Sequence, residues 1–524
     1  MNGNIKANQK QVWSPDLRNG YYQNPVIHAD YSDPDVVRVG EDFFMVASSF
    51  NMSPCLPVLH SKDLVNWKIV NHVFEKLPYS YYDKPRQSEG VWAPSIRYHD
   101  GKLWVFFATP DDGIFMSTTE DPFGKWSPLH LVKETKGWID PCPFWDDDGN
   151  AYLVHAFAKS RIGFKSVLNI CKMKQDGTAL LDEGLRVFDG HLHHPTIEGP
   201  KMYKRNGYYY IFAPAGGVTN GWQTVLRSKN IYGPYEDKVV LHQGSTLVNG
   251  PHQGAWVELE TSESWFIHFQ DKGPYGRITH LQPMRWADDW PVIGNNVNAE
   301  GVGEPVMSWK KPTTAFVGEE CTPQTSDIFE GSSLGLQWQW RANIQREWYD
   351  LREGGLRLHA HKRTEETDTF YDTAQILTQK FPALAFTVTT HLTFSADSEG
   401  DTAGLMVFGH DYAGIKLKKS PSGMSLIKFI GQQRDERTVE QEQFVLEVDT
   451  STLYFRIEVK EGARCEFSFS IDGDNFQSID FPFQAKDGGW SGAQLGIFCL
   501  NEGGEHSVGY ADYHSFYIEA KEGG

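Results

Sequence analysis

Cysteine is scarce in this sequence and does not cluster. Six cysteines occur among 524 residues, and no two of them form a Cys-x-x-Cys pair. Zinc sites and disulfide frameworks both need cysteines in characteristic, closely spaced patterns. The spacing therefore argues against both kinds of site, and we expect free thiols.

The sequence also lacks long apolar runs and an excess of basic residues. No run of eighteen apolar residues occurs, so we expect no segment that spans a membrane. Lys and Arg number 49 against 68 Asp and Glu, a formal charge of −19. That charge argues against nucleic acid and anionic membranes as partners, whereas it is compatible with a neutral substrate such as a sugar.

The first twelve residues are polar and have no apolar core of the kind that a secretory signal contains. We therefore expect a cytoplasmic protein, or a periplasmic or secreted one if a leader was removed before this sequence begins. Nothing in the composition indicates an oligomeric state.

Aromatic residues, glycine and proline are plentiful, and they recur in a repeat. Aromatic residues make up 14% of the chain. In each unit a small or acidic residue before Pro or Gly precedes an aromatic strand, a turn and a second strand. The units open at Asp33-Pro34, Ala93-Pro94, Asp140-Pro141, Gly199-Pro200 and near Gly254-Ala255. Their spacing of about 50 residues suits a four-stranded blade. Five such units predict a five-bladed β-propeller.

The repeat lapses after residue 308, where the Pro- and Thr-bearing segment Trp309–Gln324 reads as a connector. Alternating apolar and polar segments return from Asp327 onward, which is typical of an antiparallel β-sandwich. We therefore predict an all-β protein with two domains, a propeller over residues 1–318 and a jelly-roll-like sandwich over residues 319–524.

Three carboxylates lie at the openings of different blades. Asp33 and Asp140 stand directly before Pro, and Glu198 stands before Gly199-Pro200. The first strand of each blade faces the central channel, so the three side chains should converge. Any one of them could be an ordinary turn residue. Together they favour glycoside hydrolysis, which needs one protonated acid and one ionised base. A non-catalytic carbohydrate-binding protein, the alternative, has no use for a matched acid and base.

Five ordered motifs carry a resemblance to glycoside hydrolase family 43. They are "NPVIHADYSDPDVVRVGEDFFM", "GVWAPSIRYHDGKLWVFF", "DPCPFWDDDGNAYLV", "IEGPKMYKRNGYYYIF" and "GPHQGAWVE". The family comprises β-xylosidases, α-L-arabinofuranosidases and arabinanases, and many xylosidase-like members carry a C-terminal concanavalin-like sandwich. The resemblance implies that Asp33 is the general base, Glu198 the general acid and Asp140 the carboxylate that orients the acid and tunes its pKa. It also implies inversion at the anomeric carbon.

The resemblance extends to residues that would shape the sugar site. Phe50 and Trp92 match aromatic walls around the sugar, with core packing as the alternative. His252 matches a histidine that holds a water or a cation beneath the site, against a satisfied core histidine. Arg277 matches an arginine that contacts sugar hydroxyls or the catalytic carboxylates, against a surface ion pair. Trp222, in "AGGVTNGWQ", is a candidate for an outer subsite.

Two further patterns invite a metal interpretation. His191, His193 and His194 form a His-x-His-His cluster, although a loop role is favoured over a zinc site. Asp146–Gly149 resembles a fragment of a calcium loop, but it falls where the other repeats place a hairpin turn. We expect no direct metal ligand and no required cofactor, and a structural Ca²⁺ stays open.

The leading hypothesis is an inverting exo-glycosidase that removes terminal β-D-xylosyl units, and also α-L-arabinofuranosyl units, from hemicellulose-derived oligosaccharides. The expected partner is a xylo- or arabino-oligosaccharide. A dedicated α-L-arabinofuranosidase or an arabinan-cleaving enzyme is the alternative, because loops that close the site decide between them.

Overall fold

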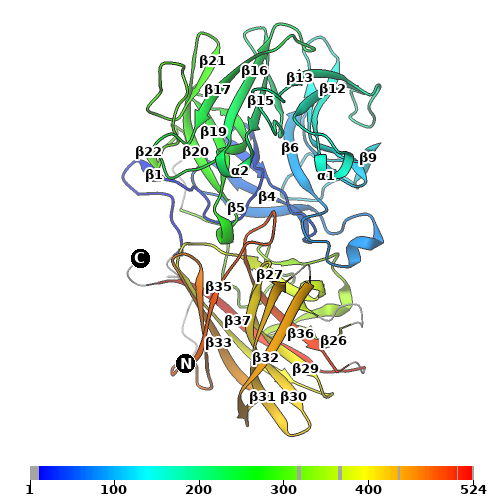
Figure 1. The fold of residues 1–524 in the computed structure, drawn as a ribbon, viewed down its shortest axis with the longest axis vertical. Coiled ribbons are helices and arrows are strands. Elements are labelled where there is room, and N and C mark those ends of the chain that lie inside the picture. The colour runs from blue at the N-terminus through cyan, green and yellow to red at the C-terminus, as the bar shows by residue number, and fades with distance from the viewer. Residues whose placement is uncertain (1–10, 316–319, 364–368, 435–436, 504–505, 522–524) are drawn as a thin grey trace.

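The chain forms two β-rich domains stacked end to end, with the N-terminal half above the C-terminal half in Figure 1. The computed structural model describes residues 11–315, 320–363, 369–434, 437–503 and 506–521. Two short helices, α1 (Lys159–Ile162) and α2 (Gly217–Asn220), lie among the propeller strands. In the described residues no helix is long and apolar enough to cross a membrane.

The N-terminal domain is a propeller of five four-stranded antiparallel sheets, each formed by consecutive strands. Blade 1 consists of β2 (Asp35–Val39), β3 (Asp42–Val46), β4 (Cys55–Ser61) and β5 (Lys68–Phe74). Blade 2 consists of β6 (Trp92–His99), β7 (Lys102–Thr109), β8 (Gly113–Thr119) and β9 (His130–Glu134). Blade 3 consists of β10 (Trp138–Trp145), β11 (Ala151–Phe157), β12 (Val167–Met173) and β13 (Leu185–Asp189). Blade 4 consists of β14 (Lys201–Arg205), β15 (Tyr208–Ala215), β16 (Trp222–Ser228) and β17 (Glu236–His242). Blade 5 consists of β18 (His252–Glu258), β19 (Ser264–Asp271), β20 (Arg277–Ala287) and β21 (Trp290–Ile293).

Tight hairpins join the first two strands of the blades. Asp100 and Gly101 have φ angles of 49° and 73°, and Asn206 and Gly207 have φ angles of 51° and 72°. Two consecutive positive φ angles are the requirement of a type I′ turn, which matches the twist of paired strands. The Asp-Gly and Asn-Gly pairs of the repeat therefore set the blade register.

The ring closes where the start of the chain meets the last blade. β1 (Tyr21–Gln23) pairs antiparallel with β22 (Ser308–Lys310). Asn24 follows β1, and its side-chain amide donates to the carbonyls of Leu281 and Val306, both at 2.8 Å. Its amide oxygen accepts from the N–H of Leu281, also at 2.8 Å. One side chain thus fastens the segment before blade 1 onto blade 5.

The C-terminal domain is a sandwich of two sheets, so the predicted fold class is confirmed. One sheet follows the order β23-β27-β36-β29-β30-β31-β32, and β26 also pairs with β36. The other follows the order β24-β25-β37-β28-β33-β34-β35. The strands are β23 (Gln339–Trp340), β24 (Tyr349–Arg352), β25 (Gly355–His359), β26 (His361–Lys362), β27 (Ile376–Lys380), β28 (Phe386–Ser395), β29 (Asp401–Phe408), β30 (Tyr412–Ser420), β31 (Gly423–Arg434), β32 (Arg437–Val448), β33 (Thr452–Lys460), β34 (Arg464–Ser470), β35 (Gln477–Gln484), β36 (Gln494–Asn501) and β37 (Tyr510–Ala520).

The two domains share buried contacts. Tyr275, between β19 and β20 of blade 5, packs into the hydrophobic core of the sandwich. Its hydroxyl donates to the carbonyl of Leu384 and accepts from the N–H of Ala463, both at 2.8 Å. The domain boundary expected at residue 318 falls in residues 316–319, outside the described residues, and stays a prediction.

Candidate active site

Each blade opens with one residue in the left-handed backbone region, at or just before its innermost strand. Their φ angles are 56° for Asp33, 27° for Ala93, 57° for Asp140, 58° for Gly199 and 35° for Gln253. Asp tolerates this region better than most residues with a side chain, and glycine is unrestricted there. The repeat in the sequence therefore corresponds to one left-handed residue at the opening of each blade.

The positions of the three carboxylates differ in one respect from the sequence analysis, which treated them as equivalent. Asp33 and Asp140 occupy the left-handed position, but in blade 4 Gly199 occupies it and Glu198 precedes it by one residue. A Cβ atom at Gly199 would lie 2.6 Å from Cδ of Gln253, and the φ angle of 58° also favours glycine here. The offset is visible in the sequence as the Gly199 that separates Glu198 from Pro200, but the sequence does not show which residue takes the left-handed position.

Asp33 is almost completely buried, and hydrogen-bond donors hold its carboxylate. Oδ2 accepts from the hydroxyls of Ser32 at 2.7 Å and Ser48 at 2.5 Å. Oδ1 lies 3.4 Å from Nη1 of Arg277, which also donates to Ser32 at 2.7 Å. The hydroxyl of Ser48 in turn accepts from the N–H of Ala93 at 2.8 Å, which ties blade 1 to blade 2. These donors fix the orientation of Asp33 and stabilise negative charge on it.

Asp140 lies close enough to the other two carboxylates to feel their charges. Burial raises the pKa of Asp140 well above its ordinary value, and the negative charges of Glu198 and Asp33 raise that pKa further. The N–H of Gly199, which donates to Oδ2 at 2.7 Å, and the ammonium of Lys201 both lower the pKa of Asp140, but by less. The structure therefore brings the three predicted carboxylates into one cluster.

Glu198 is the most accessible carboxylate of the three. Its side chain is 25% exposed, against 5% for the side chain of Asp33. Nε2 of His252 lies 2.9 Å from Oε1 of Glu198 and orients this carboxyl. His252 is 1% exposed, and its Nδ1 has no hydrogen-bond partner among the described residues. A role of His252 in holding a water or a cation stays a prediction.

Arg277 is buried beside Asp33, and an aromatic side chain from the second domain covers it. The Cζ atom of Arg277 lies 4.9 Å from the ring centroid of Phe269 and 5.4 Å from that of Trp490. Trp490 belongs to the segment between β35 and β36 of the sandwich. Its ring centroid is also 6.4 Å from that of Trp92, with the rings nearly perpendicular. The sandwich thus contributes a residue to the rim of the carboxylate cluster.

The two predicted aromatic walls differ in accessibility. Trp92 is half-buried, with its indole N–H donating to the carbonyl of Ser88 at 2.9 Å and Arg161 5.3 Å from its ring. Phe50 is only 6% exposed and has a φ angle of 51°. Its backbone exchanges two hydrogen bonds with Val91, at 3.1 and 3.0 Å. Trp92 therefore presents more surface to a ligand than Phe50 does.

Trp222 begins β16, and one of the three clustered histidines positions it. Nδ1 of His194 accepts from the indole N–H of Trp222 at 3.2 Å and from the hydroxyl of Thr224 at 3.1 Å. Nε2 of His194 lies 2.8 Å from Asp237. His191 instead contacts Asp189 at 2.6 Å and is exposed. Because His191 and His194 have separate partners, the His-x-His-His motif supports a loop role.

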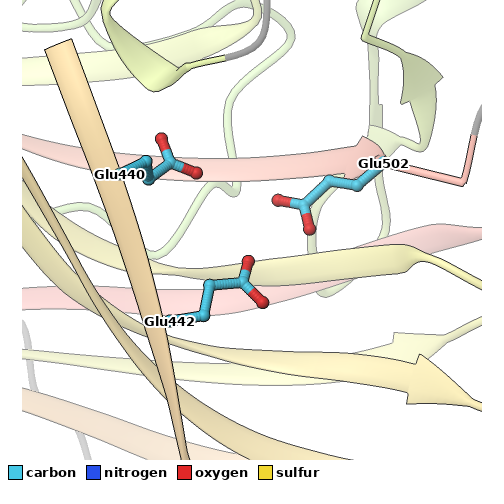
Figure 2. Close-up of side chains that lie close together, drawn as sticks. All are labelled: Glu440, Glu442 and Glu502. Atoms are coloured by element: carbon cyan, nitrogen blue, oxygen red, sulfur yellow. The ribbon is translucent and has the colours of Figure 1, made fainter.

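Two groups of acidic residues bear on metal binding. Asp146 lies in the hairpin turn between β10 and β11, where its carboxylate accepts from Lys204 and, at 2.5 Å, from the hydroxyl of Tyr209. In the described part of the chain, one group brings three potential ligand atoms within 4.8 Å of one another. It consists of Glu440, Glu442 and Glu502 in the sandwich, whose side chains point toward one another in Figure 2.

The three glutamates already have positively charged partners. Nζ of Lys416 lies 2.5 Å from Glu442 and 2.6 Å from Glu502. Lys418 contacts the same two glutamates, at 2.8 and 3.0 Å, and Arg363 contacts Glu440 and Glu502, at 3.4 and 3.2 Å. Three cations therefore balance three anions, which describes an ion-pair network rather than a cation site.

The sequence analysis missed several residues of the cluster. Ser48 follows β3 of blade 1 with no motif to mark it, and Trp490 lies in the other domain. Lys201 follows Gly199-Pro200 directly, and it has the pattern of an ordinary strand residue. The repeat marks only the Pro and Gly residues that open each blade. Residues that reach the cluster from other parts of the chain carry no such motif, so the sequence does not predict them.

Comparison with known proteins identifies the family of this chain. Residues 22–291, more than half of the chain, match the family model described as glycosyl hydrolases family 43. The chain belongs to glycoside hydrolase family 43. Residues 326–519 match the beta xylosidase C-terminal concanavalin A-like domain. The family 43 protein described here is therefore a glycoside hydrolase, and its membership confirms the resemblance found in the sequence.

Two relatives of this family 43 chain are similar over nearly its whole length, and a third is similar over about three quarters of it. A Xylanibacter ruminicola protein, provisionally named a β-xylosidase, is 41% identical over 492 residues, which are 93% of this chain and 87% of the relative. A β-xylosidase of Formosa agariphila is 31% identical over 98% of this chain and 92% of its own. A non-reducing end α-L-arabinofuranosidase of Bacteroides ovatus is 29% identical over 74% of each chain.

Solved structures share the two-domain fold. The xylan β-1,4-xylosidase of Bacillus halodurans superposes with a TM-score of 0.81 and 23% identity, covering 95% of this chain and 99% of its own. The family 43 protein of Bacillus licheniformis gives a TM-score of 0.80 at 24% identity, covering 96% and 100%. At this identity the likeness extends to the fold alone.

Proposed function

We propose that this enzyme removes terminal β-D-xylosyl units from xylo-oligosaccharides with inversion at the anomeric carbon, and that it also removes α-L-arabinofuranosyl units. The clustering of Asp33, Asp140 and Glu198, with Glu198 the most accessible, is the observation that carries the proposal. The names of the relatives, β-xylosidases and an α-L-arabinofuranosidase, support the choice of sugars.

Asp33 acts as the general base. Three donors on its two oxygens stabilise its negative charge and leave its orientation fixed. It removes a proton from a water molecule while that water attacks the anomeric carbon from the face opposite the leaving group. An inverting enzyme needs its acid and base roughly 6.5–9.5 Å apart so that this water fits between them.

Glu198 acts as the general acid. Its side chain is 25% exposed and so accessible to a substrate, and the hydrogen bond to His252 holds it in one orientation. It gives its proton to the glycosidic oxygen as the bond to the anomeric carbon breaks. Asp140 lies close enough to both carboxylates to feel their charges, and its Oδ2 accepts from the N–H of Gly199, the residue after Glu198, so it helps to orient the acid.

The sandwich domain completes the rim of the site. Its segment next to Trp490 is fastened to the propeller, because the N–H of Gly492 donates to Asp30 at 2.9 Å and the side chain of Gln87 donates to the carbonyl of Gly488 at 2.6 Å. Trp490 and Trp92 offer flat rings to the apolar faces of a pentose. A rim built from both domains suits exo action on chain ends.

Initial rates on 4-nitrophenyl β-D-xylopyranoside and 4-nitrophenyl α-L-arabinofuranoside test the proposal, with Asp33→Ala as the control. We expect cleavage of both glycosides, with the xyloside faster, and no turnover by the variant. Proton NMR of xylobiose hydrolysis should show α-xylose from the non-reducing end as the first product.

Other outcomes separate the alternatives. Cleavage of the arabinofuranoside alone would identify a dedicated arabinofuranosidase, and β-xylose as the first product would contradict inversion. If neither glycoside is cleaved, polymeric arabinan is the next substrate. An active Asp33→Ala variant would remove the assigned base.

A further inference from the structure

A second ring of residues lies directly behind the carboxylates. In every blade, the residue two positions after the left-handed residue lies in the innermost strand. The five residues at this position are Asp35, Ser95, Cys142, Lys201 and Ala255. All five are 0% exposed. The ring is therefore a closed layer in the propeller, one step beyond the site.

Lys201 is the cation of this second ring, and its hydrogen bonds go to neutral oxygens rather than to a carboxylate. Its Nζ donates to the carbonyl of Pro94 and the hydroxyl of Ser95, both at 2.8 Å, and both are neutral oxygens. The nearest carboxylate oxygen of the ring, Oδ2 of Asp35, is 4.0 Å away. A fully buried ammonium is costly to maintain, so its presence calls for a function.

Asp35 is already occupied by another cation. Its Oδ2 accepts from Nη1 of Arg97 at 2.7 Å and from the N–H of Ile96 at 2.8 Å. Nη2 of Arg97 continues to Sγ of Cys142, at 2.9 Å. With one anion and two cations, the layer that contains Asp35, Arg97 and Lys201 carries one net positive charge beneath the site.

The charges of the two layers can be counted together. The site holds three carboxyl groups, Asp33, Asp140 and Glu198, and one cation, Arg277, which also faces Asp271 at 4.0 Å. The second layer adds one net positive charge from Lys201, which lowers the pKa of Asp140. In a buried cluster, like charges repel strongly, so a positive charge behind the carboxylates stabilises their ionised forms.

We propose that the buried ammonium of Lys201, together with Arg277, offsets negative charge in the carboxylate cluster and so sets the pH range in which the cluster carries out acid–base catalysis. Lys201 touches neither substrate nor reacting atoms, so it is a positioning residue. The inference rests on the proposed function, because it assumes the acid and base assigned above.

Other titratable or charged groups face the cluster from every blade. They are Asp35 of β2, Arg97 of β6, Cys142 of β10, Tyr203 of β14, His252 of β18, Asp271 of β19 and Arg277 of β20. A matched pair of substitutions isolates the effect of the buried charge from theirs. Lys201→Met removes one positive charge at nearly constant volume, and Asp35→Asn removes one negative charge from the same layer.

The pH dependence of kcat/KM on 4-nitrophenyl β-D-xylopyranoside is the test. Lys201→Met should move the profile to higher pH by about 0.5–1 unit, because the carboxyl groups then bind protons more tightly. Asp35→Asn should move it to lower pH by a similar amount. Ser95→Ala removes a hydrogen bond to the same ammonium without changing charge, and its profile should stay in place.

A purely structural role would lower the rates of both charge variants without moving their profiles in opposite directions, and that result would overturn the inference. If circular dichroism shows that one of the two variants does not fold, the shift of the other variant's pH profile relative to wild type tests the inference. Should Asp33→Ala retain activity, the assignment of the base fails instead, so the two failures can be told apart.

Discussion

Replacement of Asp140 by Asn removes one charge from a carboxylate that is only 3% exposed and changes its shape very little. The Asn side-chain oxygen can still accept the hydrogen bond from the N–H of Gly199. Burial, together with the charges of Glu198 and Asp33, raises the pKa of Asp140 in the folded protein. The variant is therefore expected to be more stable at neutral pH and less active.

The sign follows from proton linkage. A raised pKa means that the folded state binds the proton of Asp140 more tightly than the unfolded state does. The stability from this group is then fully present below about pH 3.9, the ordinary pKa of Asp, and is lost as the pH rises through the folded-state pKa. Wild type carries this cost at neutral pH, and Asp140→Asn does not.

The size follows from the same relation. Each unit by which the pKa of Asp140 is raised adds about 1.4 kcal/mol to the gain in free energy of unfolding at pH 8. In a domain this large, each such unit corresponds to a Tm increase of about 2 °C or more. Activity should fall about 100-fold, because the cluster loses a carboxylate that supports acid–base catalysis.

Differential scanning calorimetry at pH 4, 6 and 8, together with kcat/KM at each pH, checks this prediction. The Tm difference between Asp140→Asn and wild type should be near zero at pH 4 and grow toward pH 8. A lower Tm for the variant at pH 8, or a difference that does not change with pH, would refute the reasoning.

Three further substitutions test other parts of the structure. Trp490→Ala should raise KM for xylobiose about 3- to 10-fold with a smaller effect on kcat, because it removes a ring from the rim; an unchanged KM would show that the sandwich does not shape the site. Ser48→Ala should lower kcat/KM about 10-fold, because Asp33 loses its 2.5 Å hydrogen bond and the loss of a charge-assisted bond costs about 1.5–3 kcal/mol. Equal kinetics would mean that Ser32 and Arg277 suffice. Glu502→Gln should destabilise the protein near pH 7, because its partner cations lower the pKa of Glu502 to about 2 despite the opposing effect of burial. That stability is present above the ordinary pKa and lost as the pH falls toward 2, so the difference in calorimetric Tm should shrink on acidification; a constant difference would contradict the ion-pair network.

The sequence predicts the architecture well because each blade repeats the same local chemistry. Asp-Gly and Asn-Gly turns, aromatic strands and a residue before Pro or Gly recur at fixed places, and the hairpins at Asp100 and Asn206 adopt the turn type that these pairs favour. Convergence of Asp33 and Asp140 follows directly from that repeat. Local patterns therefore predict the propeller and the convergence of its three carboxylates, although Glu198 precedes the left-handed position by one residue.

The parts that could not be predicted depend on contacts between distant segments. Trp490 reaches the rim only because the sandwich docks on blade 5 through Tyr275, and nothing near either residue indicates that docking. The charge balance of the second ring has the same origin, since Asp35 and Lys201 come from blades 1 and 4. The pattern of a single strand predicts which of its residues are buried, but it does not predict which charged side chains from different strands lie close together.

The central claim is that Glu198 donates the proton and Asp33 activates the water. The most direct test compares kcat/KM of Glu198→Ala and Asp33→Ala on 4-nitrophenyl β-D-xylopyranoside and on xylobiose. Glu198→Ala should lose about 1000-fold or more on xylobiose and far less on the aryl xyloside, whose leaving group needs little protonation, while Asp33→Ala should be inactive on both. An equal loss on the two substrates for Glu198→Ala would contradict its assignment as the acid.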